Sequence, residues 1–162
     1  MIRASFAAVF IVASLGACGG ANRTAGSSTA VQTTEPSARS ASVISSDILA
    51  REPLTNVAQV KHILIGWNGL QPHDPRADKR TKEQAEAQVR ALLEQIRGGA
   101  DFDALMKQWS EDPGSAASAK AYRVAPDAQL VIEFRQLGLR LKTDEVGVVE
   151  SDFGFHIIKR VE

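Results

Sequence analysis

The sequence has little that would cross-link it or draw it to a highly charged partner. It contains one cysteine, Cys18, in 162 residues, so no intrachain disulfide can form and a folded domain must be stabilised by its core alone. Lys and Arg together number 19, as do Asp and Glu, and no long run of basic residues is present. We therefore expect no binding to nucleic acid.

Long hydrophobic runs are also scarce, and the one at residues 4–15 follows Arg3 at the start of the chain. A run of this length is too short to span a bilayer as a helix and is typical of an export signal. The residues that follow read Leu-Gly-Ala-Cys-Gly and resemble the bacterial lipobox. This resemblance implies a signal peptide over residues 1–17 and a mature protein that begins with a lipidated Cys18. The alternative is a plain secretory cleavage site that happens to adjoin a cysteine.

The segment after Cys18 lacks the large apolar side chains of a core. Up to about Ser46, Ser, Thr, Ala and Gly predominate, and such a composition cannot bury enough surface to offset the entropy of ordering the chain. We predict a flexible tether over residues 18–56, of which residues 47–56 are ambiguous, and a folded domain over residues 57–162. Gly19 stands where an Asp retains some bacterial lipoproteins in the inner membrane. This favours the periplasmic face of the outer membrane as the location in the cell envelope.

The hydrophobic pattern changes at Val57 and predicts an α+β domain. From Val57 to Trp67 the residues alternate as in a strand, with His62 on the same face as Val60 and Leu64. Four strands in the expected order indicate one small, mainly antiparallel sheet. The remaining expected elements are a helix opened by the capping box of Thr81 and Gln84, a helix capped by Asp101, a short strand near 121–124, a helix over 128–141, and strands near 146–150 and 155–161.

Four segments of the chain, in this order, resemble the parvulin, or PpiC-type, family of peptidyl-prolyl cis/trans isomerases. They are Val60 to Ile65, Gly99 to Leu105, Trp109 to Ala116, and Phe153 to Lys159, which matches the family's terminal motif most closely. The resemblance covers residues 57–162 and implies a parvulin-like fold, with about four helices around a four-stranded sheet. It implies rotation about X-Pro bonds as the activity and proline-containing unfolded or exported polypeptides as partners. No cofactor and no metal are expected.

Catalysis of this rotation requires no covalent chemistry. The barrier of about 18 to 20 kcal/mol comes from the partial double bond of the amide, and unaided isomerisation takes tens of seconds or more. An apolar pocket that holds the proline ring, with fixed polar groups that favour the twisted amide over the planar one, is sufficient. A thousandfold acceleration needs about 4 kcal/mol of such differential stabilisation.

The resemblance assigns catalytic roles to His62, Asp112, His156 and Ser151. The two histidines would be paired imidazoles whose mutual orientation sets their tautomers. Asp112 would act electrostatically near the substrate carbonyl, and the Ser151 hydroxyl would hydrogen-bond one of the histidines. A structural role is the alternative for the histidines. Capping is the alternative for Asp112, which precedes Pro113 as a helix N-cap does.

The resemblance also assigns Leu130, Phe134 and Tyr122 to the pocket for the proline ring. Pure core packing is the alternative for Leu130 and Phe134. The chain departs from the family at Ala119 to Arg123, where it reads Ala-Lys-Ala-Tyr-Arg in place of Gly-Gly-Asp-Leu-Gly. Glycines that permit a positive φ or a close backbone approach are therefore lost, and we expect another path or strain there.

Three hypotheses for the function remain. The first is a monomeric, lipid-anchored prolyl isomerase that assists the folding of exported or outer-membrane proteins. The second, favoured by the altered segment, is a non-catalytic chaperone or peptide-binding module that uses the same groove. The third is a structural envelope lipoprotein that neither binds peptides nor isomerises them. The basic loop residues Arg76, Lys79 and Arg80 are expected to be solvated charges rather than a phosphate site.

Overall fold

The computed structural model describes residues 41–70 and 74–162. The expected signal peptide, Cys18 and the larger part of the predicted tether lie outside the described residues. Within these residues, no helix has the length and apolar character that crossing a membrane requires. The elements in chain order are α1 (Ser46–Leu49), β1 (Ala58–Ile65), a 3-10 turn η1 (Ala77–Lys79), α2 (Lys82–Arg97), α3 (Phe102–Trp109), α4 (Pro113–Ser118), β2 (Tyr122–Val124), α5 (Ile132–Gly138), β3 (Val146–Ser151) and β4 (Gly154–Arg160).

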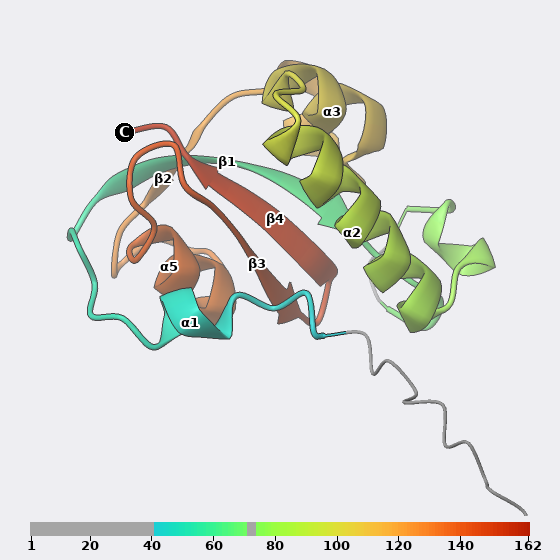
Figure 1. Cartoon of the computed structure of the whole chain (residues 1–162), viewed down its shortest axis with the longest axis horizontal. Coiled ribbons are helices and arrows are strands. Elements are labelled where there is room, and N and C mark those ends of the chain that lie inside the picture. Colours follow the sequence, from blue (N-terminus) through green and yellow to red (C-terminus); the bar gives the residue numbers. More distant parts are fainter. Residues whose placement is uncertain (1–40, 71–73) are drawn as a thin grey trace, which may run out of the picture. The chain divides into compact units, whose positions relative to one another are not determined.

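The four strands form one antiparallel sheet in the order β2-β1-β4-β3 (Figure 1). The predicted α+β class with a small four-stranded sheet is confirmed. The central strands β1 and β4 are far apart in the sequence, and their register pairs His62 with Ile158 and Leu64 with His156. Because paired residues share a face and side chains alternate along a strand, His62 and His156 lie on the same face of the sheet.

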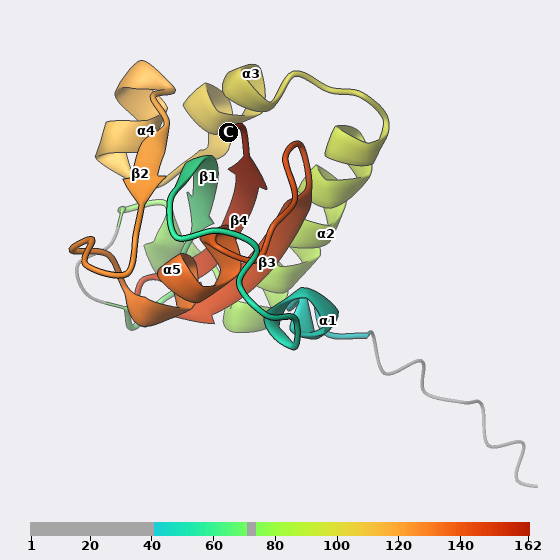
Figure 2. The ribbon, with the colours of Figure 1, turned by 90° about the vertical axis from the view of Figure 1, so that its left-hand side faces the viewer.

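Helices cover both faces of the sheet (Figures 1 and 2). On one face, α2 and α3 pack against Ile63, Ile65 and Ile157 and enclose one part of the core. On the other face, α5 packs through Phe134 and Leu137 against the side that carries the two histidines. The short helix α4 follows α3 and leads directly into the edge strand β2 (Figure 2). The candidate site therefore lies between the sheet, α5 and the segment around α4.

Local capping signals place the helix starts. The Thr81 side chain accepts the backbone N–H of Gln84, and the Gln84 side chain accepts the N–H of Thr81, so the predicted capping box is present. Asp101 caps α3 by accepting the N–H of Ala104 at 2.7 Å. Helix α5 is shorter than the predicted 128–141 at both ends, because residues 126–130 form turns and bends before it and residues 139–140 form a turn after it.

The folded unit begins before the predicted boundary at Val57, since residues 41–56 belong to the same compact unit as the sheet. Val43 and Ile48 are buried in the core. The Ser45 N–H donates to the Val148 carbonyl at 2.9 Å, and the Val148 N–H donates to the Ser45 hydroxyl at 2.9 Å. Two short apolar pairs, Val43-Ile44 and Ile48-Leu49, in a Ser-rich segment carry too weak a local pattern to reveal this docking.

The hairpin between β3 and β4 turns through Asp152 and Phe153, with Ser151 paired to Gly154 across the turn. Gly154 has a φ of +131°, and a Cβ atom there would lie 2.5 Å from the Ile65 carbonyl oxygen. Only glycine combines this conformation with so close an approach. The turn is thereby held against the end of β1, next to the candidate site.

Candidate active site

The two predicted histidines form a buried pair between β1 and β4. His62 and His156 are almost fully buried, and their Nδ1 atoms lie 3.3 Å apart. The ring planes are nearly parallel, at 21°. The remaining ring nitrogens have partners at opposite ends of the pair: His62 Nε2 lies 3.3 Å from Asp112 Oδ2, and His156 Nε2 lies 2.7 Å from Ser151 Oγ.

When both imidazoles are neutral, these contacts are consistent with one direction of hydrogen bonding. Asp112 is an acceptor when ionised, so the Nε2 of His62 carries the proton that faces it. The neutral His62 ring then accepts at Nδ1, and the Nδ1–H of His156 donates to it. His156 in turn accepts at Nε2 from the Ser151 hydroxyl. We assign the tautomers on this basis, and the result is a chain of donors that runs from Ser151 through both imidazoles to Asp112.

The hydrogen bonds that the Asp112 carboxylate accepts from residues in the described ranges all fall on one oxygen. Oδ2 accepts the Ser115 N–H at 2.7 Å, the Ser115 hydroxyl at 2.5 Å and the Tyr122 hydroxyl at 2.8 Å, in addition to the His62 contact. The contact with His62, followed by those with Ser115 and Tyr122, lowers the pKa of Asp112 far below its ordinary value, although partial burial opposes the shift. Asp112 also caps α4, with Pro113 at the first position, so capping and an electrostatic role coexist in one side chain.

The pocket residues surround this chain. Phe134 lies edge-on to both imidazoles, with ring centroids 5.0 Å from His62 and 5.5 Å from His156. A hollow of about 280 Å³ opens beside them. The structure thus brings together the predicted pocket residues, the two histidines and Asp112, while Ser151 adjoins through His156. The hollow is lined by His62, Leu64, Asp112, Tyr122, Gln129, Leu130, Val131, Phe134, Phe153 and His156.

A second hollow of about 380 Å³ adjoins the first and shares Leu64, Asp112 and Phe153 with it. The two hollows meet at these shared residues, and together they are called the groove. The sequence reasoning did not assign Leu64 and Phe153 to the site, although both stand within or beside the matched segments. It also missed Ser115, for which the signal was available, because a residue three positions after an N-cap aspartate is the one whose N–H the cap accepts.

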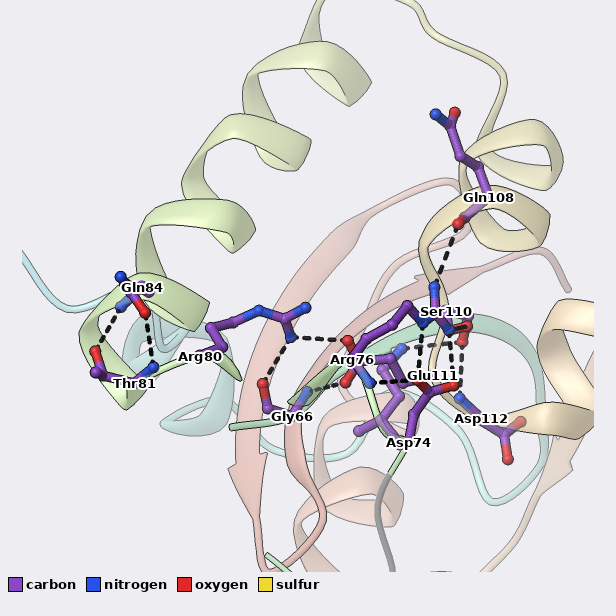
Figure 3. A network of polar contacts seen from close by, with 11 residues as sticks. Gly66, Asp74, Arg76, Arg80, Thr81, Gln84, Gln108, Ser110, Glu111 and Asp112 are labelled. Atoms are coloured by element: carbon purple, nitrogen blue, oxygen red, sulfur yellow. Dashed lines mark hydrogen bonds and ion pairs between the residues drawn. The ribbon is translucent and has the colours of Figure 1, made fainter. Parts of the chain in front are cut away.

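A buried ion pair braces the turn that carries Asp112 (Figure 3). One carboxylate oxygen of Glu111 accepts the Gly66 N–H at 2.7 Å, and the other accepts from Arg80 at 2.7 Å. Arg80 also donates to the Gly66 carbonyl at 2.7 Å. The Glu111 side chain is only 2% exposed and that of Arg80 14%. The segment before Asp112 is therefore tied to the segment after β1 by charge-assisted hydrogen bonds.

The expectation that the basic loop residues are solvated is wrong for Arg80, which the Glu111 pair buries. Arg76 is exposed, but its guanidinium binds Asp74 at 2.9 Å and the Ser110 carbonyl at 2.8 Å. Arg80 is drawn inward by Glu111, an opposite charge 31 positions away in the sequence. Lys79 is exposed, as expected.

The altered segment contains a strained position. Ala119, the C-cap of α4, has a φ of 50° in the left-handed region. A residue with a Cβ atom pays about 1 kcal/mol or more for this conformation. The backbone thus takes a left-handed turn with an alanine at one of the places where the family has glycine. Strain, one of the two expected consequences of losing the glycines, is present there.

In the described part of the chain, no group of three or more His, Cys, Asp or Glu side chains is arranged to hold a metal ion. The arrangement is instead a hydrogen-bonded polar chain in the wall of an apolar groove. Such a site can bind an uncharged, ring-bearing group and present polar atoms to the bond beside it.

Comparison with known proteins identifies the domain. A family model described as the PPIC-type PPIase domain matches residues 46–162. The chain belongs to this family. Among curated relatives, the chaperone SurA of Alkalilimnicola ehrlichii is 35% identical over 102 residues, which cover 62% of this chain and 22% of SurA. The foldase protein PrsA of Geobacillus kaustophilus is 37% identical over 78 residues, which cover 48% of this chain and 27% of PrsA.

Solved structures agree with this assignment. The peptidylprolyl isomerase PrsA of Bacillus cereus matches with a TM-score of 0.51 and 28% identity, over 72% of this chain and 38% of that one. The peptidyl-prolyl isomerase ESS1 of Candida albicans matches with a TM-score of 0.57 and 22% identity, over 66% of this chain and 63% of that one. The PPIC-type fold is confirmed. The matched region spans less than a third of the length of the two curated relatives named above.

Replacement of Glu111 by Gln should destabilise the domain by about 3 kcal/mol, because Arg80 would keep a largely buried charge without its partner. The measurement is the free energy of unfolding in urea. Glu145→Gln is the matched control, since Glu145 pairs with Arg51 at 2.8 Å but both side chains are about a quarter to a third exposed, and its loss should cost about 1 kcal/mol. Equal losses of unfolding free energy in the two variants would show that the Glu111–Arg80 pair stabilises the domain no more than an exposed ion pair does.

The stability of the domain should depend on pH through His156. Burial, and then the neighbouring His62, lower the pKa of His156 to about 3, against a weaker opposing effect of Asp112, whereas it is about 6.5 in an unfolded chain. Between these values the unfolded state alone binds the proton, so stability falls as the pH falls.

From pH 6 to pH 4 the unmodified protein should therefore lose about 2 kcal/mol more stability than His156→Gln, which lacks the titrating group. Urea unfolding of both proteins at a series of pH values measures this difference. Parallel pH dependences would show that His156 is not buried in its neutral form.

Proposed function

We propose that the protein is a peptidyl-prolyl cis/trans isomerase that assists the folding of exported proteins. The observation that carries the proposal is the hydrogen-bonded chain from Ser151 to Asp112, which ends at the wall of an apolar hollow. Membership of the PPIC-type family supports the reaction class. The substrates are proline-containing segments of unfolded polypeptides.

The apolar hollow holds the proline ring. Leu130, Phe134 and Tyr122 supply its walls, and burial of the ring against them positions the preceding peptide bond beside Asp112 and His62. Binding energy from the rest of the peptide, in the adjoining hollow, holds the chain on both sides of the bond while it rotates.

Asp112 lowers the rotational barrier through its charge. In a planar amide the carbonyl oxygen carries partial negative charge through resonance, and in the twisted amide it carries less. A fixed carboxylate near that oxygen disfavours the planar form more than the twisted one, which reduces the free-energy difference between them. The hydrogen bonds on Oδ2 keep Asp112 ionised for this role. His62, His156 and Ser151 hold the carboxylate and its donors in one arrangement.

A peptide-binding module without catalysis is the second candidate function. The strained Ala119 and the altered segment next to Tyr122 favour it, because they change the wall of the groove without closing it. The same hollow would bind proline-containing segments but would not reduce the free-energy difference between the planar and the twisted amide. Activity measurements separate this candidate from the first.

We further propose that the protein acts in the cell envelope as a lipid-anchored monomer, on the periplasmic face of the outer membrane. The export signal at residues 1–17 and the lipobox-like residues around Cys18 support the anchor. The relatives named chaperone and foldase support a role in protein folding.

Asp112→Asn should reduce kcat/KM for proline tetrapeptides by about 30-fold, or roughly 2 kcal/mol of barrier, because it removes the charge. Asparagine caps helices as well as aspartate does, so the fold is retained. Asp101→Asn is the control, since Asp101 caps α3 in the same manner, and it should leave the rate unchanged. The measurement is the rate of cis-to-trans conversion, with the residue before proline varied.

Two outcomes of this experiment would count against the proposal. If both variants retain full activity, Asp112 is a helix cap only. If the unmodified, folded protein accelerates none of the peptides, the isomerase proposal is wrong, and peptide binding becomes the function to measure.

Cys18→Ala should release the protein from the membrane fraction of its host cells, because the acyl chains would have no attachment site. Incorporation of radiolabelled fatty acid, followed by cell fractionation, measures this directly. A native protein that incorporates no lipid would exclude the anchor.

A further inference from the structure

Tyr122 carries a hydroxyl group that an apolar pocket wall does not need. Tyr122 is the only tyrosine in the chain and lies on the edge strand β2. Its ring packs edge-on to His62, with centroids 5.2 Å apart, which serves the apolar wall. Its hydroxyl, however, donates to Asp112 Oδ2 at 2.8 Å. The residue therefore contacts both polar groups at the end of the hydrogen-bonded chain.

The hydrogen bonds on Asp112 are divided unevenly between its two oxygens. Oδ2 accepts from Ser115 twice, from Tyr122 and from His62, which is more than two lone pairs ordinarily serve. Oδ1 accepts no hydrogen bond from a residue in the described ranges. Because Asp112 lines both hollows, its carboxylate lies where a bound peptide would pass.

The backbone makes room for the Tyr122 hydroxyl. A Cβ atom at Gly114 would lie 2.6 Å from the Tyr122 hydroxyl oxygen and 3.4 Å from Asp112 Oδ2. Any side chain at Gly114 would push the phenol away from the carboxylate. The hydroxyl thus occupies the space that a side chain at Gly114, the second residue of α4, would fill.

We propose that Tyr122 is a positioning residue that holds Oδ2 of Asp112 through its hydroxyl, so that Oδ1 faces the peptide bond before proline. This inference rests on the proposed isomerase function. Leucine, which the family commonly has at this position, would preserve the wall of the pocket but supply no donor. In this chain the carboxylate is restrained from the side of β2 as well as by α4 and His62.

Removal of the hydroxyl alone tests the inference. Tyr122→Phe and Tyr122→Leu should each lower kcat about tenfold, the scale expected for a hydrogen bond to a charged group, with KM changed less than twofold because the apolar wall remains. Gly114→Ala, which displaces the hydroxyl without changing the tyrosine, should have a similar effect. In the Asp112→Asn background, Tyr122→Phe should cause less than a twofold further loss, since the two residues act as a unit.

A spectroscopic measurement tests the contact without any assay of activity. Burial, and then the hydrogen bond to Asp112, raise the pKa of Tyr122 above its ordinary value of 10. Because the chain has one tyrosine, ultraviolet titration of the full chain reports this group directly. Asp112→Asn removes the charge but not the burial, so Tyr122 should ionise at lower pH than in the unmodified protein. Asp101→Asn should leave the titration unchanged.

The outcomes distinguish failure of the inference from failure of the proposed function. An active protein in which Tyr122→Phe retains its kcat, or in which Tyr122→Phe and Asp112→Asn have additive effects, overturns the inference alone. An unchanged tyrosine titration in Asp112→Asn overturns the contact itself, whatever the activity. An unmodified protein that titrates as expected but accelerates no peptide overturns the proposed function and the catalytic part of this inference.

Discussion

The attachment of residues 110–112 to the end of β1 is the contact on which the site depends. The Leu64 N–H donates to the Ser110 hydroxyl at 3.1 Å, and the Leu64 carbonyl accepts the Glu111 N–H at 2.9 Å. Since Leu64 is two residues after His62, this attachment brings Asp112 beside the imidazole. The buried Glu111 carboxylate, held by Arg80 and a backbone amide, then prevents the turn from moving away.

The constraint extends along the polar chain because the two imidazoles at its centre are buried. A buried polar group without a hydrogen-bond partner costs about 1 to 3 kcal/mol, so each member must satisfy the next. Ser151, His156 and His62 do so in one direction, and Asp112 ends the chain as an ionised acceptor. This order explains why the site contains a carboxylate whose pKa is strongly lowered in spite of its partial burial. It also means that the loss of one donor would disturb the hydrogen bonds of the other members of the chain.

The altered segment after α4 shows how a chain can change a site without losing the fold. Ala119 takes the left-handed conformation in spite of its Cβ atom, because the surrounding contacts of the helix and of β2 fix the path of the backbone. Three residues later the same segment supplies Tyr122, whose hydroxyl reaches Asp112. A local conformational cost and a new polar contact therefore arise in one short stretch.

The sequence by itself determined the elements whose causes are local: alternation along β1, the capping box at Thr81 and the cap at Asp101. Ordered motifs also identified the residues that gather at the site, although their catalytic roles remain predictions. Only the tertiary structure decided the docking of residues 41–56, the pairing of Glu111 with Arg80, and the division of hydrogen bonds on Asp112. These features depend on contacts between distant segments, and no local pattern encodes which atoms meet when the sheet closes.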